Sequence, residues 1–185
     1  MDFQACVGSK ARTTLDAREK TRQFVTRMSD QPRKFLVVAD TSEECHSALY
    51  FAARRAVATE GLLTILSVLE PSNFDHWIGV SETMRREAEE SATQLMESLA
   101  EEAEGITGIR PEMLLREGDR RECLSQLIED DQDIALLVLG ASESGEGPGP
   151  LVSALARGKG LFGSRPIPIT VVPGNLSHAA IDAMT

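Results

Sequence analysis

Two apolar segments about a hundred residues apart decide the fold: FLVVADTS at residues 35–42 and ALLVLGASESGEGPGP at residues 135–150. Each begins with a short apolar run of the length of a buried strand. The first run ends in Asp40, and the second opens into a glycine-rich loop at Gly140. In parallel α/β sheets, small ligands bind beyond the carboxyl ends of strands, near the point where strand order reverses. The two segments therefore suggest a nucleotide pocket.

Composition limits the classes of protein to consider. The 185-residue chain is long enough for one α/β domain, and its 42% hydrophobic content favours a globular fold. A net charge of −10 argues against nucleic acid or an anionic membrane as a partner. We find no apolar run near the roughly 20 residues of a membrane helix, and no secretory signal. Three cysteines without zinc-site spacing favour a reducing, cytoplasmic setting.

Apolar periodicity predicts strands that alternate with helices. The first helix is predicted to begin at Thr41, with Glu44 at capping-box spacing, and to end at Gly61 in a C-cap role. Later helices are predicted at about 81–104, 120–129 and 150–157, and strands at 35–40, 62–69, about 110–116, 135–140 and 167–172. Right-handed crossovers between these strands require a parallel sheet with helices on both faces.

From about residue 33 to residue 174 the chain resembles the universal stress protein family. The matching motifs are FLVVADTS (35–42), LTILSVLEP (63–71), EGD (117–119), DIALLVLGAS (133–142) and PIPITVVPG (166–174). The loop sequence GEGPGPLVSAL at 145–155 resembles that of a proteobacterial subgroup. We therefore expect an N-terminal extension at 1–32, mobile or helical, a universal stress protein-like domain at 33–175, and a C-terminal tail at 176–185.

The resemblance implies a fold and a function. The implied fold is a three-layer α/β sandwich, Rossmann-like and similar to the adenine nucleotide alpha hydrolases, with a five-stranded parallel sheet in the order 3-2-1-4-5. It implies a homodimer that pairs through the last strand, residues 167–172, and acts in stress response or regulation. Many members bind ATP at the ends of strands one and four. Others bind no nucleotide.

We therefore expect a dimeric stress-response protein that binds an adenine nucleotide, ATP or AMP with Mg²⁺. The open alternative is the same fold acting without any cofactor, as a protein-interaction module. The sequence contains no general base placed by a motif and no set of metal ligands, so a slow ATPase is the most that we expect of it as an enzyme. We expect no nucleic acid and no membrane among its partners.

The glycine motif of the ATP-binding members, Gly-x2-Gly-x9-Gly-Ser, is incomplete here. Gly140 fills its first position, but Glu143 and the pair Ser153-Ala154 stand at the others. A carboxylate at position 143 would repel phosphate if it faced the pocket. The loop offers other glycines that can bring backbone amides close to a phosphate by a different path. These are Gly145, Gly147 and Gly149.

Most candidate site residues have both a ligand-binding and a structural interpretation. Asp40 is suited to accept hydrogen bonds from ribose hydroxyls, or to order the turn into the first helix. Thr41 begins that helix, and its position suits either binding of an anion at the helix N-terminus or simple capping of the helix. Val68 corresponds to a residue that flanks the adenine in the family, and its structural interpretation is core packing. Gly118 matches a glycine near the family's pocket, and its structural interpretation is that it permits a turn. The candidate nucleotide-binding residues are Asp40, Thr41, Val68, Gly118, Gly140, Gly147, Gly149 and Ser153.

Overall fold

The computed structural model describes residues 32–70, 80–143, 147–158 and 163–185, without the side chains of residues 80 and 81. The predicted N-terminal extension lies outside these residues except for Pro32. The elements in chain order are β1 (Lys34–Val38), α2 (Glu43–Thr59), β2 (Leu62–Leu69), α3 (Val80–Thr107), β3 (Glu112–Glu117), α4 (Arg120–Asp130), β4 (Ile134–Ala141), α5 (Pro150–Ala156), β5 (Ile169–Pro173) and α6 (His178–Asp182).

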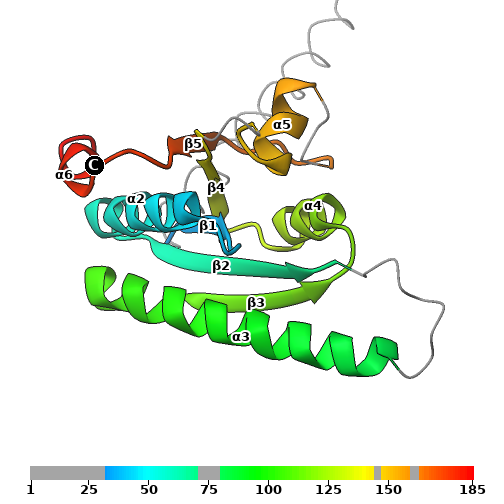
Figure 1. The fold of residues 1–185 in the computed structure, drawn as a ribbon. Coiled ribbons are helices and arrows are strands. Elements are labelled where there is room, and N and C mark those ends of the chain that lie inside the picture. The colour runs from blue at the N-terminus through cyan, green and yellow to red at the C-terminus, as the bar shows by residue number, and fades with distance from the viewer. Residues whose placement is uncertain (1–31, 71–79, 144–146, 159–162) are drawn as a thin grey trace, which may run out of the picture. The chain divides into compact units, whose positions relative to one another are not determined.

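The strands form a parallel sheet in the order β3-β2-β1-β4-β5, which confirms the predicted fold class (Figure 1). The chain builds the sheet outward from β1 to β3 and then returns to add β4 and β5 on the other side of β1. Strand order therefore reverses between β1 and β4. The loops that leave these two strands diverge, and a crevice at their carboxyl ends is the expected place for a ligand.

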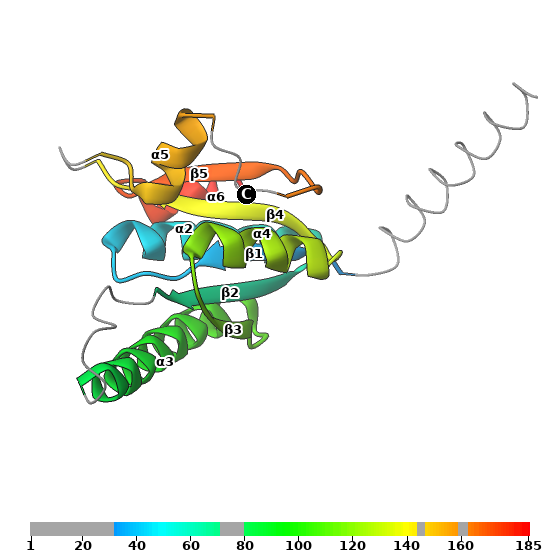
Figure 2. The same cartoon turned by 90° about the vertical axis from the view of Figure 1, so that its right-hand side faces the viewer.

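Strand β1 is buried on both faces, which explains its uninterrupted apolar sequence. Phe35 and Val37 point into a core cluster with α2 and α3, whereas Leu36 and Val38 point into a second cluster with α4 and α5. Helices α2 and α3 thus cover one face of the sheet, and α4 and α5 cover the other (Figures 1 and 2). These two layers fix the directions from which side chains reach the carboxyl ends of β1 and β4.

The start of α2 differs from the prediction. Its N-cap is Ser42 rather than Thr41, and Thr41 is exposed. The Ser42 hydroxyl donates to the Asp40 carboxylate instead of accepting a bond from the helix. The capping box proposed for Thr41 and Glu44 is therefore wrong, because Asp40 competes for the hydroxyl that a cap would use.

The end of α2 also corrects the sequence analysis. The C-cap is Glu60, which has a left-handed φ of 53°, and not Gly61. A Cβ atom at position 61 would lie 2.6 Å from a Phe35 ring carbon and 2.7 Å from the carbonyl oxygen of Arg33. Glycine is required there because β1 approaches the backbone closely, and helix capping is not the reason.

The segment expected to be a tail, residues 176–185, contains helix α6. The Ser177 side chain caps it by accepting a hydrogen bond from the backbone of residue 180. Ile181 is fully buried, and the His178 ring stacks on Tyr50 of α2 with ring centroids 3.8 Å apart. A helix of five residues is too short to produce a readable apolar period, so the sequence pattern misses it. In the described residues, we find no helix with the length and apolarity to cross a membrane.

Candidate functional site

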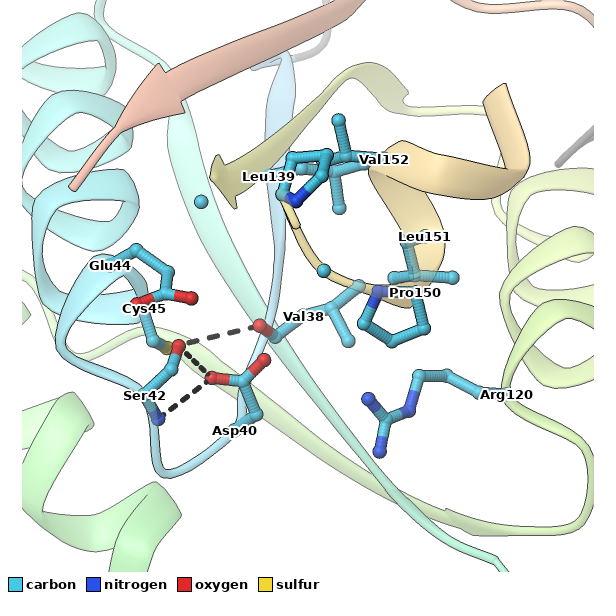
Figure 3. Close-up of a pocket in the computed structure, with 13 residues that line it drawn as sticks. Val38, Asp40, Ser42, Glu44, Cys45, Arg120, Leu139, Pro150, Leu151 and Val152 are labelled. Carbon is cyan, nitrogen blue, oxygen red and sulfur yellow. Dashed lines mark hydrogen bonds between the residues drawn. The ribbon is translucent and has the colours of Figure 1, made fainter. Parts of the chain in front are cut away.

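A cavity of about 170 Å³ opens at the carboxyl ends of β1 and β4, at the point where strand order reverses. Figure 3 shows the side chains around it. The end of β1 contributes Val38 and, just beyond the strand, Asp40. The entry into α2 contributes Ser42, Glu44 and Cys45. These residues come together because the chain passes directly from β1 into the helix that covers the sheet.

The opposite wall comes from more distant parts of the sequence. Leu139 and Gly140 at the end of β4 line the cavity, as do residues 148–152, which lead into and begin α5. Arg120, the first residue of α4, reaches the cavity from the side opposite Asp40, beside Pro150 (Figure 3). The cavity therefore combines apolar walls with both carboxylate and guanidinium groups, as small-molecule sites do.

Asp40 is held in a fixed turn. One of its carboxylate oxygens accepts hydrogen bonds from the backbone N–H of Ser42, at 3.0 Å, and from the Ser42 hydroxyl. Both bonds reach the same oxygen, and Figure 3 shows the second oxygen directed toward the pocket. Thus Asp40 orders the turn into α2 and also leaves one carboxylate oxygen facing the cavity. The two interpretations of this residue are compatible.

Gly140 has a packing role as well as a place in the cavity. A Cβ atom there would overlap the carbonyl oxygen of Glu44 and would lie 2.7 Å from its carbonyl carbon. Gly174, after β5, approaches the same helix, because a Cβ atom added to it would lie 3.0 Å from the Glu44 Cβ. The first turn of α2 therefore rests on two glycines at the ends of neighbouring strands. Gly140 sets how closely Asp40 and Ser42 approach β4.

Three of the predicted site residues line this cavity, and they are Asp40, Gly140 and Gly149. Gly149 has a φ of 93°, which permits the sharp turn into Pro150 at the start of α5. The other five lie outside the lining. Thr41 is exposed, and Val68 packs against the core cluster beneath α4 and α5. Gly118, Gly147 and Ser153 lie elsewhere on the surrounding loops and on α5.

The charges around the cavity differ from the sequence prediction. Glu143 is exposed and outside the lining, and its carboxylate accepts a hydrogen bond from the Asn175 side chain. Glu143 would repel a phosphate only if it faced the pocket, and this condition is not met. Glu44 and Arg120 line the cavity instead, and sequence reasoning missed both. Arg120 follows Gly118-Asp119 at the end of β3, so its nearness to the same edge of the sheet was a readable signal.

Cys45 places a thiol in the wall of the cavity. The side chain is 3% exposed, and its sulfur donates to the carbonyl oxygen of Val38 over 3.8 Å. Burial raises the pKa of this thiol to about 11, so it is neutral at physiological pH. A neutral, buried thiol is a poor nucleophile, and Cys45 therefore acts as an apolar wall. Within the part of the chain that the structure describes, no group of three His, Cys, Asp or Glu residues is placed to hold a metal ion.

The fold and the position of the cavity define a doubly wound α/β protein with a ligand site at its switch point. The universal stress protein family model matches residues 32–157, and the chain belongs to this family. No significant match was found among curated protein sequences.

Solved structures of the family share this fold. The universal stress protein UspA from Lactobacillus plantarum has a TM-score of 0.64 and 18% identity, over 77% of this chain and 98% of that one. The universal stress protein from Archaeoglobus fulgidus in complex with dAMP has a TM-score of 0.54 and 16% identity, over 77% of this chain and 97% of that one. A universal stress protein in complex with cAMP has a TM-score of 0.50 and 17% identity, over 76% and 96%. At these identities the likeness shows the fold alone.

Proposed function

We propose that this protein is a dimeric stress-response regulator that binds an adenine nucleotide between the carboxyl ends of β1 and β4. The observation that carries the proposal is the cavity at the switch point, with the Asp40 carboxylate at its edge. Two structurally similar members of the family were solved in complex with dAMP and cAMP, which supports an adenine nucleotide as the class of ligand.

The residues around the cavity suggest how the nucleoside is held. The second oxygen of Asp40 accepts hydrogen bonds from ribose hydroxyls, and the first keeps the carboxylate fixed through Ser42. Val38, Leu139 and Val152 provide apolar surface for the base. Fixing a polar acceptor beside apolar walls lowers the entropic cost of ordering the site on binding. Any Mg²⁺ enters with the phosphates of ATP, because magnesium is commonly bound through substrate phosphates and water.

The substitution Asp40→Asn tests the nucleoside site. Asparagine keeps the side-chain shape and can still accept a bond from the Ser42 backbone, so the turn is retained. A neutral amide is a weaker acceptor for ribose, and we expect roughly a tenfold loss of affinity for adenosine and for AMP. Isothermal titration calorimetry of nucleotide-stripped protein measures this change.

A control is available at the amino ends of the strands. Asp131 also accepts a backbone N–H two residues along the chain, from Asp133 at 3.0 Å, and its other carboxylate oxygen pairs with Lys34 at 2.7 Å. The variant Asp131→Asn should leave nucleotide affinity unchanged. If folded wild-type protein shows neither heat nor a shift in melting temperature with any adenine nucleotide at millimolar concentration, the proposed binding is wrong.

The proposed homodimer forms through β5. This strand is at one edge of the sheet, and Val171 on it is 41% exposed. An unpaired edge offers backbone donors and acceptors to a second copy of the chain. We expect light scattering to give the mass of a dimer, and Val171→Lys to give mostly monomer. A wild-type monomer at micromolar concentration contradicts this assembly.

A nucleotide-free interaction module is the second candidate function. One observation favours it: two carboxylates, Asp40 and Glu44, line a cavity of about 170 Å³. This volume is below the roughly 300–1,000 Å³ of typical small-molecule pockets. The absence of binding in the calorimetric experiment, with the dimer intact, would favour this candidate.

A further inference from the structure

A second cavity, of about 360 Å³, adjoins the first one on the side of α4. Arg120, Pro150 and Leu151 line both cavities, so these residues form the boundary between them. Together the two volumes fall within the range of typical small-molecule pockets. The second cavity is therefore placed to receive the part of a ligand that the first cavity cannot contain.

The second cavity is rich in arginine, although the chain as a whole has a net charge of −10. Arg120 and Arg121 come from the first turn of α4, and Arg157 comes from the end of α5. Among the described residues, neither Arg121 nor Arg157 has an ion-pair partner. Guanidinium groups bind phosphate oxygens through paired N–H donors, and this geometry suits an anion with several oxygens.

Two carboxylates also line this cavity, and neither neutralises the arginines fully. Asp119 caps α4, and one of its oxygens accepts the backbone N–H groups of Arg121 and Glu122, both at 3.0 Å. Glu70 lies 3.7 Å from the Nε atom of Arg120, which is longer than a hydrogen bond. The Glu70 side chain is 54% exposed, so it can move away from Arg120 when an anion of higher charge binds.

We propose that this second cavity is a polyphosphate subsite, in which Arg120, Arg121 and Arg157 bind the phosphates of the nucleotide. The arginines would then replace the glycines that this chain lacks at positions 143 and 153. The inference rests on the proposed nucleoside site for its adenine half, but the phosphate half has its own test. A polyphosphate subsite identifies the ligand as a nucleoside di- or triphosphate rather than a monophosphate or a cyclic nucleotide.

The double variant Arg121→Gln/Arg157→Gln tests the subsite. Both side chains are exposed, so the fold should tolerate the changes. With wild-type protein we expect ATP to bind at least tenfold more tightly than adenosine. The double variant should lose roughly 10- to 100-fold in ATP affinity and keep its affinity for adenosine. Calorimetry with both ligands measures these two constants separately.

A control variant removes the same amount of charge from elsewhere. Arg33 precedes β1 and Arg55 lies late in α2, and neither lines either of these two cavities. Arg33→Gln/Arg55→Gln should retain the wild-type affinity for ATP. If this control loses as much affinity as R121Q/R157Q, or if R121Q/R157Q loses none, the subsite is refuted.

Inorganic tripolyphosphate separates this inference from the proposed function. If no adenine compound binds but tripolyphosphate does, and R121Q/R157Q abolishes its binding, the nucleoside site fails and the phosphate subsite stands. If adenosine binds, but the affinities for ATP and for tripolyphosphate are the same in wild type and in R121Q/R157Q, the nucleoside site stands and the subsite fails. Binding of AMP as tight as that of ATP also counts against the subsite.

Discussion

Gly140→Ala is expected to lower the free energy of unfolding by about 3 kcal/mol, since a methyl group at this position overpacks a close backbone contact. The added carbon would overlap the carbonyl oxygen of Glu44 and lie 2.7 Å from the carbonyl carbon, so α2 must move away from β4. A helix backbone cannot relieve this contact by a simple rotamer change. Urea unfolding measures the loss. A lower midpoint concentration of urea, with an unchanged dependence of the free energy of unfolding on urea, reports lower stability.

Gly105 provides the matched control for this substitution. It lies within α3, and a Cβ atom there meets no atom of the described residues within 4 Å. Gly105→Ala should therefore stabilise the protein by about 0.5–1 kcal/mol, as alanine does in helices. Equal stability of G140A and wild type would show that α2 does not rest on Gly140. Because G140A also displaces the residues beside Asp40, a loss of nucleotide affinity in it would not identify a phosphate contact.

The sheet was predictable because its signals are local. Each strand is a short apolar run, and the alternation with helices leaves a parallel sheet as the consistent arrangement. The predicted strand bounds differ from the observed ones where a proline lies near the start of the strand. β5 was expected to begin at Ile167 but begins at Ile169, after Pro168. Proline has no N–H to donate to a neighbouring strand, so the regular strand begins after Pro168, although the Pro168 carbonyl still accepts a hydrogen bond from Leu137 of β4 at 3.1 Å.

The candidate site was predictable only in part, because its walls depend on tertiary packing. Asp40 and Gly140 follow directly from strand ends, and the cavity includes both. The direction of Glu143 depends on Asn175, which lies 32 residues further along the chain. The approach of Arg120 depends on where α4 lies against the sheet. The contact of Glu143 produces no local pattern in the sequence, and the place of Arg120 after β3 shows only that it lies near this end of the sheet, so the charge of the pocket could not be predicted from the glycine motif.

Arg165→Met is expected to lower the free energy of unfolding by about 3 kcal/mol, because it leaves several backbone carbonyls without their charged donor. One terminal nitrogen of Arg165 donates to the carbonyls of Ile128, at 2.7 Å, and Asp131, at 2.9 Å. The other donates to the carbonyls of Gln132 and Ile134, both at 2.8 Å. The guanidinium thus joins the end of α4 to the start of β4. Chemical denaturation followed by circular dichroism measures the effect.

Arg165→Lys separates charge from geometry. Lysine keeps the positive charge near the carboxyl end of α4, which is favourable for the helix dipole, but a single ammonium cannot reach all four carbonyls. We expect lysine to recover less than half of the lost stability. Arg86→Met, which removes a 73% exposed side chain 3.6 Å from Glu90, should change stability by less than about 0.5 kcal/mol. If R165M were as mild as R86M, the joint between α4 and β4 would have to be held by the apolar core beneath it rather than by this arginine.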